Sequence, residues 1–383
     1  MRVLIVGAGI GGLSAAIALR RQGIETALLE RTTELKEIGA GIAIAANAMK
    51  ALGSLGLEDT VRQIGAEPPF YDIRSWRGEL LSRVLVSEQS EKVGATSIAA
   101  HRADLQTALL QGLMYAGGEV HLGAECVGFE QTGRYVRASF ADGREERGDL
   151  LIGADGLNST VRERLLGDGP PRYAGYTTWR AVVSPEHDLV PQEDVESWGR
   201  GTRFLFARIG RGRVYWAAAQ TAPQGTDREP AEGRKDALLG SFRGWHEPIE
   251  ELIRATDERA ILHTAIYDRD PLGERWGEGR VSLLGDAAHP MTPDLGQGAC
   301  QAIEDAVVLA KCLSEESDPV SALRHYEARR TRRVAAIVQR SRRFGRVAQL
   351  KNPFLCRLRD VLLKKTPDRM LLRQAEEIVS YEV

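Results

Sequence analysis

The chain has 383 residues, 43% of them hydrophobic, which is enough for a substantial core and more than one typical compact domain contains. Its 51 basic and 53 acidic side chains give a formal net charge of -2, so the overall charge favours neither a nucleic acid nor an anionic membrane as partner. The four cysteines have no metal-binding spacing, so we expect reduced thiols in a cytoplasmic protein without a metal site.

The beginning of the chain has the pattern of a βαβ unit. Residues 3–6 predict a buried strand, residues 11–22 a helix and residues 26–30 a second strand, as in a parallel sheet covered on both faces. A signal peptide is disfavoured because a single arginine precedes the apolar run and glycines recur inside it. No later segment reaches the roughly 20 apolar residues of a membrane span, so we expect no stable membrane insertion.

A glycine fingerprint of the GxGxxG type joins the first strand to the helix. Gly7 would permit the tight turn, Gly9 would let the backbone approach a pyrophosphate, and Gly12 would allow close packing of helix and strand. Glu30 follows at the end of the second strand, where a carboxylate accepts hydrogen bonds from ribose hydroxyls and repels a 2′-phosphate. The pattern therefore favours FAD or NAD over NADP, without separating the first two.

Further segments extend the first sheet. Residues 135–140 and the Asp142-Gly143 turn predict a hairpin, and residues 149–153 predict a buried strand behind it. Much later, residues 281–284 predict another buried strand and residues 297–313 a helix.

The middle of the chain has a different texture, rich in short β segments. Residues 173–267 include a hairpin in which 203–207 and 213–219 flank a Gly-Arg-Gly turn, and residues 70–84 have a similar pattern. We therefore expect a second, antiparallel sheet that residues 70–84 join.

The last part of the chain predicts helices with many arginines. These arginines interleave with Val334, Ile337 and Val338, as in an amphipathic helix, and short helices are expected over residues 358–372. We interpret the arginines as a solvated basic face rather than a lipid or nucleic-acid site. They are Arg329, Arg330, Arg332, Arg333, Arg340, Arg342, Arg343 and Arg346.

Two segments carry the most specific signal. Residues 153–162 read GADGLNSTVR, and residues 285–298 read GDAAHPMTPDLGQG. With the N-terminal glycine fingerprint, they resemble the signatures of the class A, para-hydroxybenzoate-hydroxylase-like FAD monooxygenases in order and spacing, over about residues 1–367. Within that family the chain is most similar to the branch of salicylate hydroxylase, FAD-dependent urate hydroxylase and zeaxanthin epoxidase.

The resemblance implies an α/β fold in which a Rossmann-like, GR2-type FAD-binding domain is interleaved with a smaller antiparallel β-sheet substrate domain and followed by C-terminal helices. The FAD-binding domain would comprise residues 1–69, 101–172 and 276–345. The substrate domain would comprise residues 70–100 and 173–275, and the helical segment residues 346–383. We expect a monomer or a homodimer.

The resemblance also implies the contacts to FAD. Asp286 follows an apolar strand, where its carboxylate suits a ribityl hydroxyl, and the helix opening near Gly298 offers amide donors to the flavin pyrimidine edge. Arg102 suits a phosphate or ring carbonyl, Asp155 would support FAD and the nicotinamide, and Arg162 would either assist electrostatically or pair on the surface. The expected contacts are Gly7, Gly9, Gly11, Gly12, Glu30, Arg31, Gly41, Ala43, Arg102, Cys126 through its backbone, Asp155, Asp286, Gly296, Gln297, Gly298, Ala299 and Cys300.

Three residues are expected to act on the substrate. Arg203 and Tyr215 match positions that hold substrate in the urate-hydroxylase branch, and Asp294 matches a residue near the flavin. A cation beside a phenol suits an anionic or enolised aromatic, with Trp179 and Trp216 as further aromatic surface. The alternative is that Arg203 pairs with a surface acid and that Tyr215 fills the interface of the sheet.

The resemblance implies an enzyme in which NADH or NADPH reduces FAD and one oxygen atom of O2 enters a small aromatic or heteroaromatic substrate, by hydroxylation through a flavin C4a-hydroperoxide. Only one dinucleotide fingerprint occurs, so the nicotinamide would bind transiently. Two alternatives stay open: an epoxidase acting on an alkene, polyene or quinolone-type substrate, and a non-catalytic flavoprotein that sequesters an intermediate.

Overall fold

A five-stranded parallel sheet, in the order β17-β11-β1-β2-β7, organises the first part of the fold. The computed structural model describes residues 1–35, 39–184, 193–228 and 233–382. The neighbouring strands pair in parallel, as expected for strands buried on both faces, which confirms the predicted βαβ unit and the returning strand. The strands are β1 (Arg2–Val6), β2 (Glu25–Leu29), β7 (Val120–His121), β11 (Leu150–Gly153) and β17 (Val281–Leu283).

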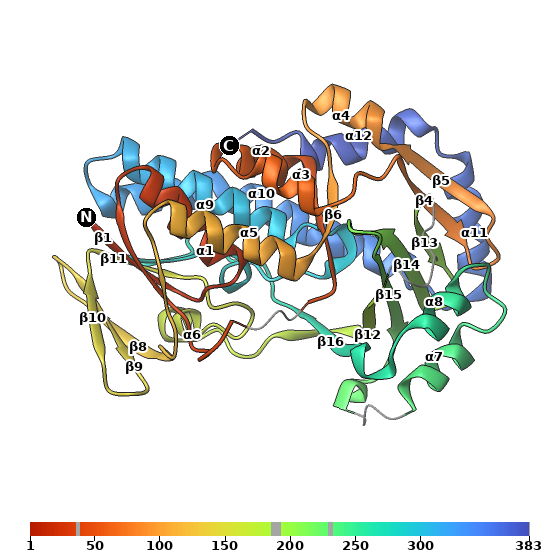
Figure 1. Cartoon of the computed structure of the whole chain (residues 1–383), viewed down its shortest axis with the longest axis horizontal. Helices are drawn as coiled ribbons and strands as arrows, with labels where there is room; N and C mark the ends of the chain where they lie inside the picture. Colours follow the sequence, from red (N-terminus) through yellow and green to blue (C-terminus); the bar gives the residue numbers. More distant parts are fainter. Residues whose placement is uncertain (36–38, 185–192, 229–232, 383) are drawn as a thin grey trace.

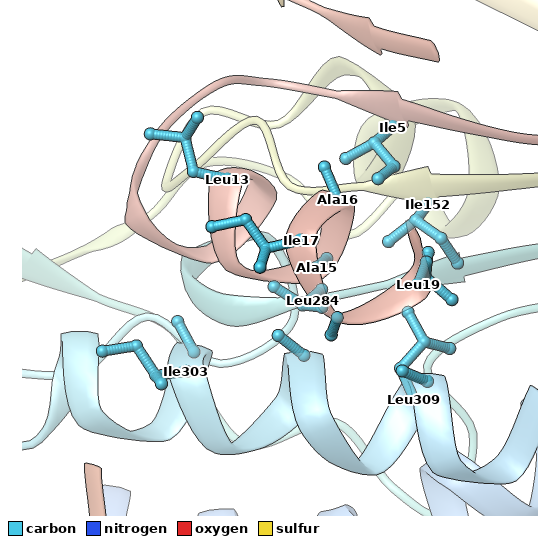
Figure 2. Close-up of a cluster of buried hydrophobic side chains, with 14 of the residues drawn as sticks. Ile5, Leu13, Ala15, Ala16, Ile17, Leu19, Ile152, Leu284, Ile303 and Leu309 are labelled. Atoms are coloured by element: carbon cyan, nitrogen blue, oxygen red, sulfur yellow. The ribbon is translucent and has the colours of Figure 1, made fainter. Parts of the chain in front are cut away.

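Helix α1 (Ile10–Arg21) lies between this sheet and α9 (Gly298–Glu315) (Figure 2). Ile5 and Ile152 project from the sheet on one side of α1, and Ile303 projects from α9 on the other. Burying one such side chain contributes about 1.5–3 kcal/mol. Because α1 begins at the glycine fingerprint and α9 begins at Gly298, this packing also fixes where the two glycine-rich loops lie.

A seven-stranded sheet, in the order β16-β12-β15-β14-β13-β4-β5, forms the second part of the fold (Figure 1). Its pairings are antiparallel, as predicted, apart from the parallel pairing of β13 with β4. Residues 70–84 join this sheet, as expected. The strands are β4 (Phe70–Ser75), β5 (Leu80–Leu85), β12 (Arg172–Val183), β13 (Asp194–Trp198), β14 (Thr202–Arg208), β15 (Val214–Thr221) and β16 (Leu262–Asp268).

The remaining elements connect and cover the two large sheets. A two-stranded sheet pairs β3 (Gly41–Ile44) with β6 (Ile98–His101), and a three-stranded sheet has the order β10-β9-β8. Its strands are β8 (Cys126–Gln131), β9 (Val136–Phe140) and β10 (Glu145–Gly148). The other helices are α2 (Ala46–Ser54), α3 (Glu58–Ile64), α4 (Val86–Val93), α5 (Arg102–Tyr115), α6 (Thr160–Leu166), α7 (Arg234–Ser241), α8 (Ile249–Ala255), α10 (Pro319–Ala348), α11 (Pro353–Lys365) and α12 (Asp368–Val379).

The described residues also contain four short 3-10 turns: η2 (Thr226–Arg228), η3 (Glu258–Ala260), η4 (Gly285–Ala287) and η5 (Pro293–Leu295). Among the residues that the structure describes, no helix combines the length and the apolar character needed to cross a bilayer. The domain boundaries expected from the sequence stay a prediction.

Helix α10 corrects the interpretation of its arginines as a solvated face. Arg330 is fully buried and forms ion pairs with Glu304 at 2.5 Å and Asp305 at 2.6 Å, both of them on α9. Its guanidinium also donates to the side chain of Gln301 at 2.7 Å. A buried charge is tolerated only when it is paired and hydrogen-bonded, and this one is.

We predict that Arg330→Met lowers the free energy of unfolding by about 3–5 kcal/mol, because two buried carboxylates lose their shared cation. Arg332→Met is the matched control: Arg332 lies on the same helix and is exposed, so its loss should change that free energy by less than about 0.5 kcal/mol. Urea unfolding followed by circular dichroism measures both. Equal stability of the two variants would contradict the assigned role of the cluster.

Candidate active site

The glycine fingerprint forms a tight turn with one open position. Gly7 has a φ of +102°, and a Cβ there would lie 2.5 Å from the Ala154 carbonyl oxygen. A Cβ on Gly12 would lie 1.9 Å from the carbonyl oxygen of Gly7, whereas a Cβ on Gly9 would meet no atom within 4 Å. Gly7 and Gly12 are thus required by the protein's own packing, and only Gly9 faces open space, where a pyrophosphate could approach.

Gly11 and Glu30 lie beside this turn in different roles. A Cβ on Gly11 would lie 2.7 Å from the Leu284 side chain, so Gly11 serves the packing of α1. The Glu30 carboxylate accepts from the Ala8 amide at 2.8 Å and from the Thr32 amide at 3.0 Å, which places it at the turn. Its oxygens can also accept from a ribose, since each carboxylate oxygen has two lone pairs.

The two remaining expected contacts near this turn differ in exposure. Arg31 is exposed. Cys126 is buried, burial raises the pKa of its thiol, and that thiol lies 3.5 Å from the Gly128 carbonyl oxygen. The Cys126 side chain therefore belongs to the core, and only its backbone is available to a ligand.

Asp155 and Arg162 fix the second signature segment, and Arg162 also ties it to the third. The Asp155 carboxylate accepts from the Ser159 hydroxyl at 2.5 Å and from the Val161 amide at 3.1 Å, so it caps the start of α6. Arg162 is buried, pairs with Asp168, and donates to the carbonyls of Ala287 at 3.0 Å and Ala288 at 2.9 Å. The expected pairing of Arg162 on the surface is wrong, because its buried side chain links α6 to the loop that carries Asp286, and the expected electrostatic assistance stays a prediction.

Asp286 presents its carboxylate in a recess. It is exposed between the buried residues Gly285 and Ala287, yet desolvation by nearby protein raises its pKa, against the opposing charges of His289 and Arg102. Arg102 is exposed at the start of α5. An accessible but partly desolvated carboxylate with an arginine near it is the donor and acceptor set that a sugar-phosphate chain requires.

The loop before α9 packs against β3. Gly296 has a φ of +62°, and a Cβ there would lie 3.3 Å from the Ala43 Cβ. The Cys300 thiol accepts from the Ala45 amide at 3.4 Å, and burial raises its pKa to about 12. Gln297 is buried, and its side-chain oxygen accepts from Asn47 at 3.1 Å. The side chains of Cys300 and Gln297 thus fix the loop, and the backbone amides near Gly298 and Ala299 remain for a ligand.

Arg203 and Asp294 come together in a buried network, as the sequence led us to expect of two site residues. Arg203 pairs with Glu196 at 3.0 Å and with Asp294, and the Tyr176 hydroxyl donates to Asp294 at 2.9 Å. Tyr71 donates to the other oxygen of Glu196 at 2.5 Å. The alternative in which Arg203 pairs with a surface acid is therefore right about the pairing and wrong about its place, because the side chains of Glu196 and Asp294 are buried.

Tyr215 lies apart from that network, against β3. A Cβ on Gly41 would lie 2.3 Å from the Tyr215 ring, so the glycine lets the phenol of β15 approach this strand. Burial raises the pKa of Tyr215, while the positive charge of Arg180 opposes the shift. The phenol thus stays protonated at neutral pH and can donate a hydrogen bond.

A residue that the sequence reasoning missed, Arg180, stands on the same face of the sheet as Tyr215. The strand register places Leu205, Ala217, Arg180 and Leu262 in one row across four strands, and all four are partly exposed. Trp179 and Trp216 point to the opposite face, into the core beneath α7 and α8. The expected aromatic surface is therefore absent from this row. The signal was available, because neighbouring residues of a strand face opposite ways.

A cavity of about 360 Å³ adjoins the buried network of Arg203 at Asp294 and Tyr176. Asp294, Tyr176 and Thr292 form its inner wall, and Arg346 and Lys351 belong to its rim near the end of α10. Its volume falls within the range of about 300–1,000 Å³ that is usual for small-molecule sites. None of the expected FAD contacts lines it.

Comparison with known proteins decides the family. The family model described as FAD binding domain matches residues 1–341. Over 366 residues, 95% of this chain and 94% of the other, the chain is 46% identical to the aurachin C monooxygenase/isomerase of Stigmatella aurantiaca. The chain belongs to the class A FAD-dependent monooxygenases.

Two further relatives agree with this assignment. The monooxygenase is 38% identical to the FAD-dependent urate hydroxylase of Mycolicibacterium vanbaalenii, over 92% of this chain and 90% of that protein. It superposes on the crystal structure of Klebsiella pneumoniae HpxO complexed with FAD and uric acid with a TM-score of 0.92, at 33% identity, covering 99% of this chain and 96% of that one. The predicted fold class, the FAD cofactor and the monooxygenase activity are confirmed.

We predict opposite defects for two alanine variants of the fingerprint. Gly9→Ala should leave the unfolding free energy of the FAD-free monooxygenase within about 0.5 kcal/mol of wild type, since its methyl meets no atom. It should weaken FAD binding at least about tenfold, because the methyl blocks the approach of the pyrophosphate. Gly12→Ala should instead lower stability by about 1–3 kcal/mol, because its methyl overlaps the Gly7 carbonyl.

Urea unfolding and fluorescence titration with FAD measure the two quantities separately. If Gly9→Ala bound FAD with wild-type affinity, the open space at Gly9 would not be the pyrophosphate position.

Proposed function

We propose that the monooxygenase inserts one oxygen atom of O2 into a small aromatic or heteroaromatic substrate that carries an anionic or strongly polarised oxygen, with NADH or NADPH as reductant. One observation carries the substrate class: Arg180, a cation with no acidic partner among the described residues, stands beside the phenol of Tyr215 on a partly exposed sheet face. That face meets β3, and β3 in turn packs against the loop that precedes α9.

In the part of the chain that the structure describes, the charge of Arg180 has no acidic partner. Within the described residues no carboxylate lies within 4 Å of its guanidinium, and the hydroxyl of Thr264, at 2.9 Å, is its one side-chain acceptor. Its Nε is buried without a hydrogen-bond acceptor. A half-buried guanidinium lacking a counter-ion is stabilised by binding an anion, and it forms strong charge-assisted hydrogen bonds with carboxylate or enolate oxygens.

The side chains divide the work in the following way. Arg102, Glu30 and Asp286, with the amides near Gly298, would hold FAD, which supplies the activation of O2 when it is bound. Tyr215 and Arg180 would orient the substrate oxygen by donating hydrogen bonds to it. Arg203 and Asp294 act as positioning residues, because each is already engaged by buried partners.

Burial also keeps Tyr176 a donor to Asp294, since desolvation raises the pKa of its phenol well above the ordinary value. The nicotinamide would bind transiently, with Asp155 acting through the turn that it caps. We further propose a cytoplasmic monomer or homodimer with no nucleic-acid partner.

A second function has specific support in the identity to a relative named aurachin C monooxygenase/isomerase. In this alternative, the substrate is of the quinolone type, and oxygen enters as an epoxide that then rearranges. Arg180 suits this substrate as well, because a quinolone carries a polarised carbonyl oxygen. The non-catalytic alternative has no such support, since the relatives are named enzymes.

A substrate screen tests the proposed function. Aromatic and heteroaromatic acids, enols and quinolones are added to the FAD-loaded protein while NADH or NADPH consumption is recorded, and the products are analysed with 18O2. A product one 18O heavier at an aromatic carbon supports hydroxylation, and a rearranged or vicinal-diol product supports epoxidation. If no anionic or polarised compound accelerated the consumption and neutral hydrocarbons did, the proposed substrate class would be wrong.

We predict that Arg180→Gln raises the KM of a stimulating compound about tenfold, because one charge-assisted hydrogen bond is lost, and leaves the flavin content unchanged. Arg200→Gln is the matched control, because Arg200 is an exposed arginine in the turn between β13 and β14. An unchanged KM in Arg180→Gln would remove this residue from the substrate site.

A further inference from the structure

We propose that the outer face of α11 binds the surface of an anionic lipid bilayer, so that the monooxygenase docks peripherally on a membrane. The helix lies at the outer edge of the molecule, beside the edge strand β5 (Figure 1). The sequence alone predicted short helices over residues 358–372 and no interaction surface on them.

One face of α11 is anchored to the protein. Cys356 and Arg359 are buried, and Leu363 packs against the small core beneath the sheet. The Arg359 guanidinium donates to the Ala348 carbonyl at 3.0 Å, which ties the helix to the end of α10. The orientation of α11 is therefore fixed, and its other face is presented to solvent.

That outer face is apolar. Phe354 is 73% exposed, and Leu358 and Leu362 are 45% and 57% exposed. They recur at intervals of four residues, so they form one stripe along the helix. Leu355 and Val361 widen it, being 42% and 44% exposed. Contiguous apolar surface of this kind marks an interaction site rather than an ordinary solvated helix.

A basic rim surrounds the stripe. Residues 342–373 hold ten Lys or Arg and two acids, although the whole chain has a net charge of -2. Two of them, Arg342 and Arg359, are engaged inside the protein, and the other eight form the rim: Arg343, Arg346, Lys351, Arg357, Lys364, Lys365, Arg369 and Arg373. A helix with large apolar side chains on one face and Lys or Arg beside them is the pattern that lies in the interface of anionic bilayers.

The positive charge of the rim favours an anionic bilayer over a second copy of the chain, and the apolar stripe favours it over a nucleic acid. A second copy docked through the same face about a two-fold axis would bring the two basic rims together, which like-charge repulsion disfavours. A nucleic acid would use the basic rim and leave the apolar stripe exposed to water. An anionic lipid surface satisfies both parts of the face.

The position of α11 gives the docking a use. Lys351 stands two residues before α11 and, with Arg346, belongs to the rim of the 360 Å³ cavity whose inner wall includes Asp294. A bilayer seated on α11 would lie beside this cavity. Aromatic substrates that partition into the lipid surface with their polarised oxygen at the headgroups would then be concentrated beside the protein; this last step rests on the proposed function, whereas the docking itself does not.

Vesicle flotation tests the proposal with the full-length, FAD-loaded protein. Vesicles of phosphatidylglycerol and phosphatidylcholine are compared with vesicles of phosphatidylcholine alone. We expect binding to the anionic vesicles that weakens with added salt, because salt screens the basic rim. The double variant Leu358→Glu/Leu362→Glu should bind at least about tenfold less.

The matched control is Met114→Glu/Tyr115→Glu, which replaces two side chains that are 72% and 93% exposed at the end of α5 with the same charges. This control should bind as wild type does. Flavin content and thermal unfolding, measured for each variant, confirm that it is folded. A third variant, Arg357→Glu/Lys365→Glu, tests the rim alone and should lose the preference for anionic lipid.

The proposal is overturned if wild type does not float with anionic vesicles, or if the α5 control loses binding to the same extent as the α11 variant. It is also overturned if the wild-type protein does not bind the vesicles and light scattering shows that it is a dimer, which the Leu358→Glu/Leu362→Glu variant dissociates. That result would assign the face to a second copy. If the wild-type protein binds the anionic vesicles but oxygenates none of the screened compounds, the result counts against the proposed function and leaves the docking in place.

Discussion

The buried cation of Arg330 is the constraint on which the rest of the site depends. Its partner Asp305 also accepts from the Gly285 amide at 3.0 Å and bonds the His289 ring at 2.6 Å, which fixes the loop that carries Asp286. Its partner Glu304 accepts from Asn47 at 2.5 Å, and Asn47 donates in turn to Gln297 in the loop before α9. A single ion cluster between two helices thus positions both loops. The cluster is stable in the interior because each charge is paired with an opposite charge and hydrogen-bonded.

The local features of this fold were predictable, whereas the partners across the chain were only partly so. The glycine turn, the two signature loops and the hairpins follow from patterns within a few residues. The burial of Arg330 also had a signal: it precedes Val334 and Ile337 by four and seven residues, which puts it on the apolar face of α10 rather than the solvated one. Composition alone did not show this, because the neighbouring Arg329 and Arg332 are exposed.

The substrate face shows what sequence could not decide. Alternation along β12 requires Trp179 and Arg180 to face opposite sides, but the choice of side depends on α7 and α8, which fold onto the sheet from later in the chain. Likewise, Arg203 is satisfied by Glu196 and by Asp294, and the latter is 91 positions away. Without these tertiary partners, the paired arginine and the free one were not distinguishable.

The same alternation bears on how such a scaffold diversifies. Leu205, Ala217, Arg180 and Leu262 come from four strands yet share one row, while their neighbours Phe204 and Trp216 pack on the far side of the sheet. Substitutions in this row would change the surface that is proposed to contact the substrate. They would leave the glycine turn and the ion cluster unchanged. Substrate specificity can therefore change during evolution through a few replacements on one surface, while the loops expected to bind FAD stay the same.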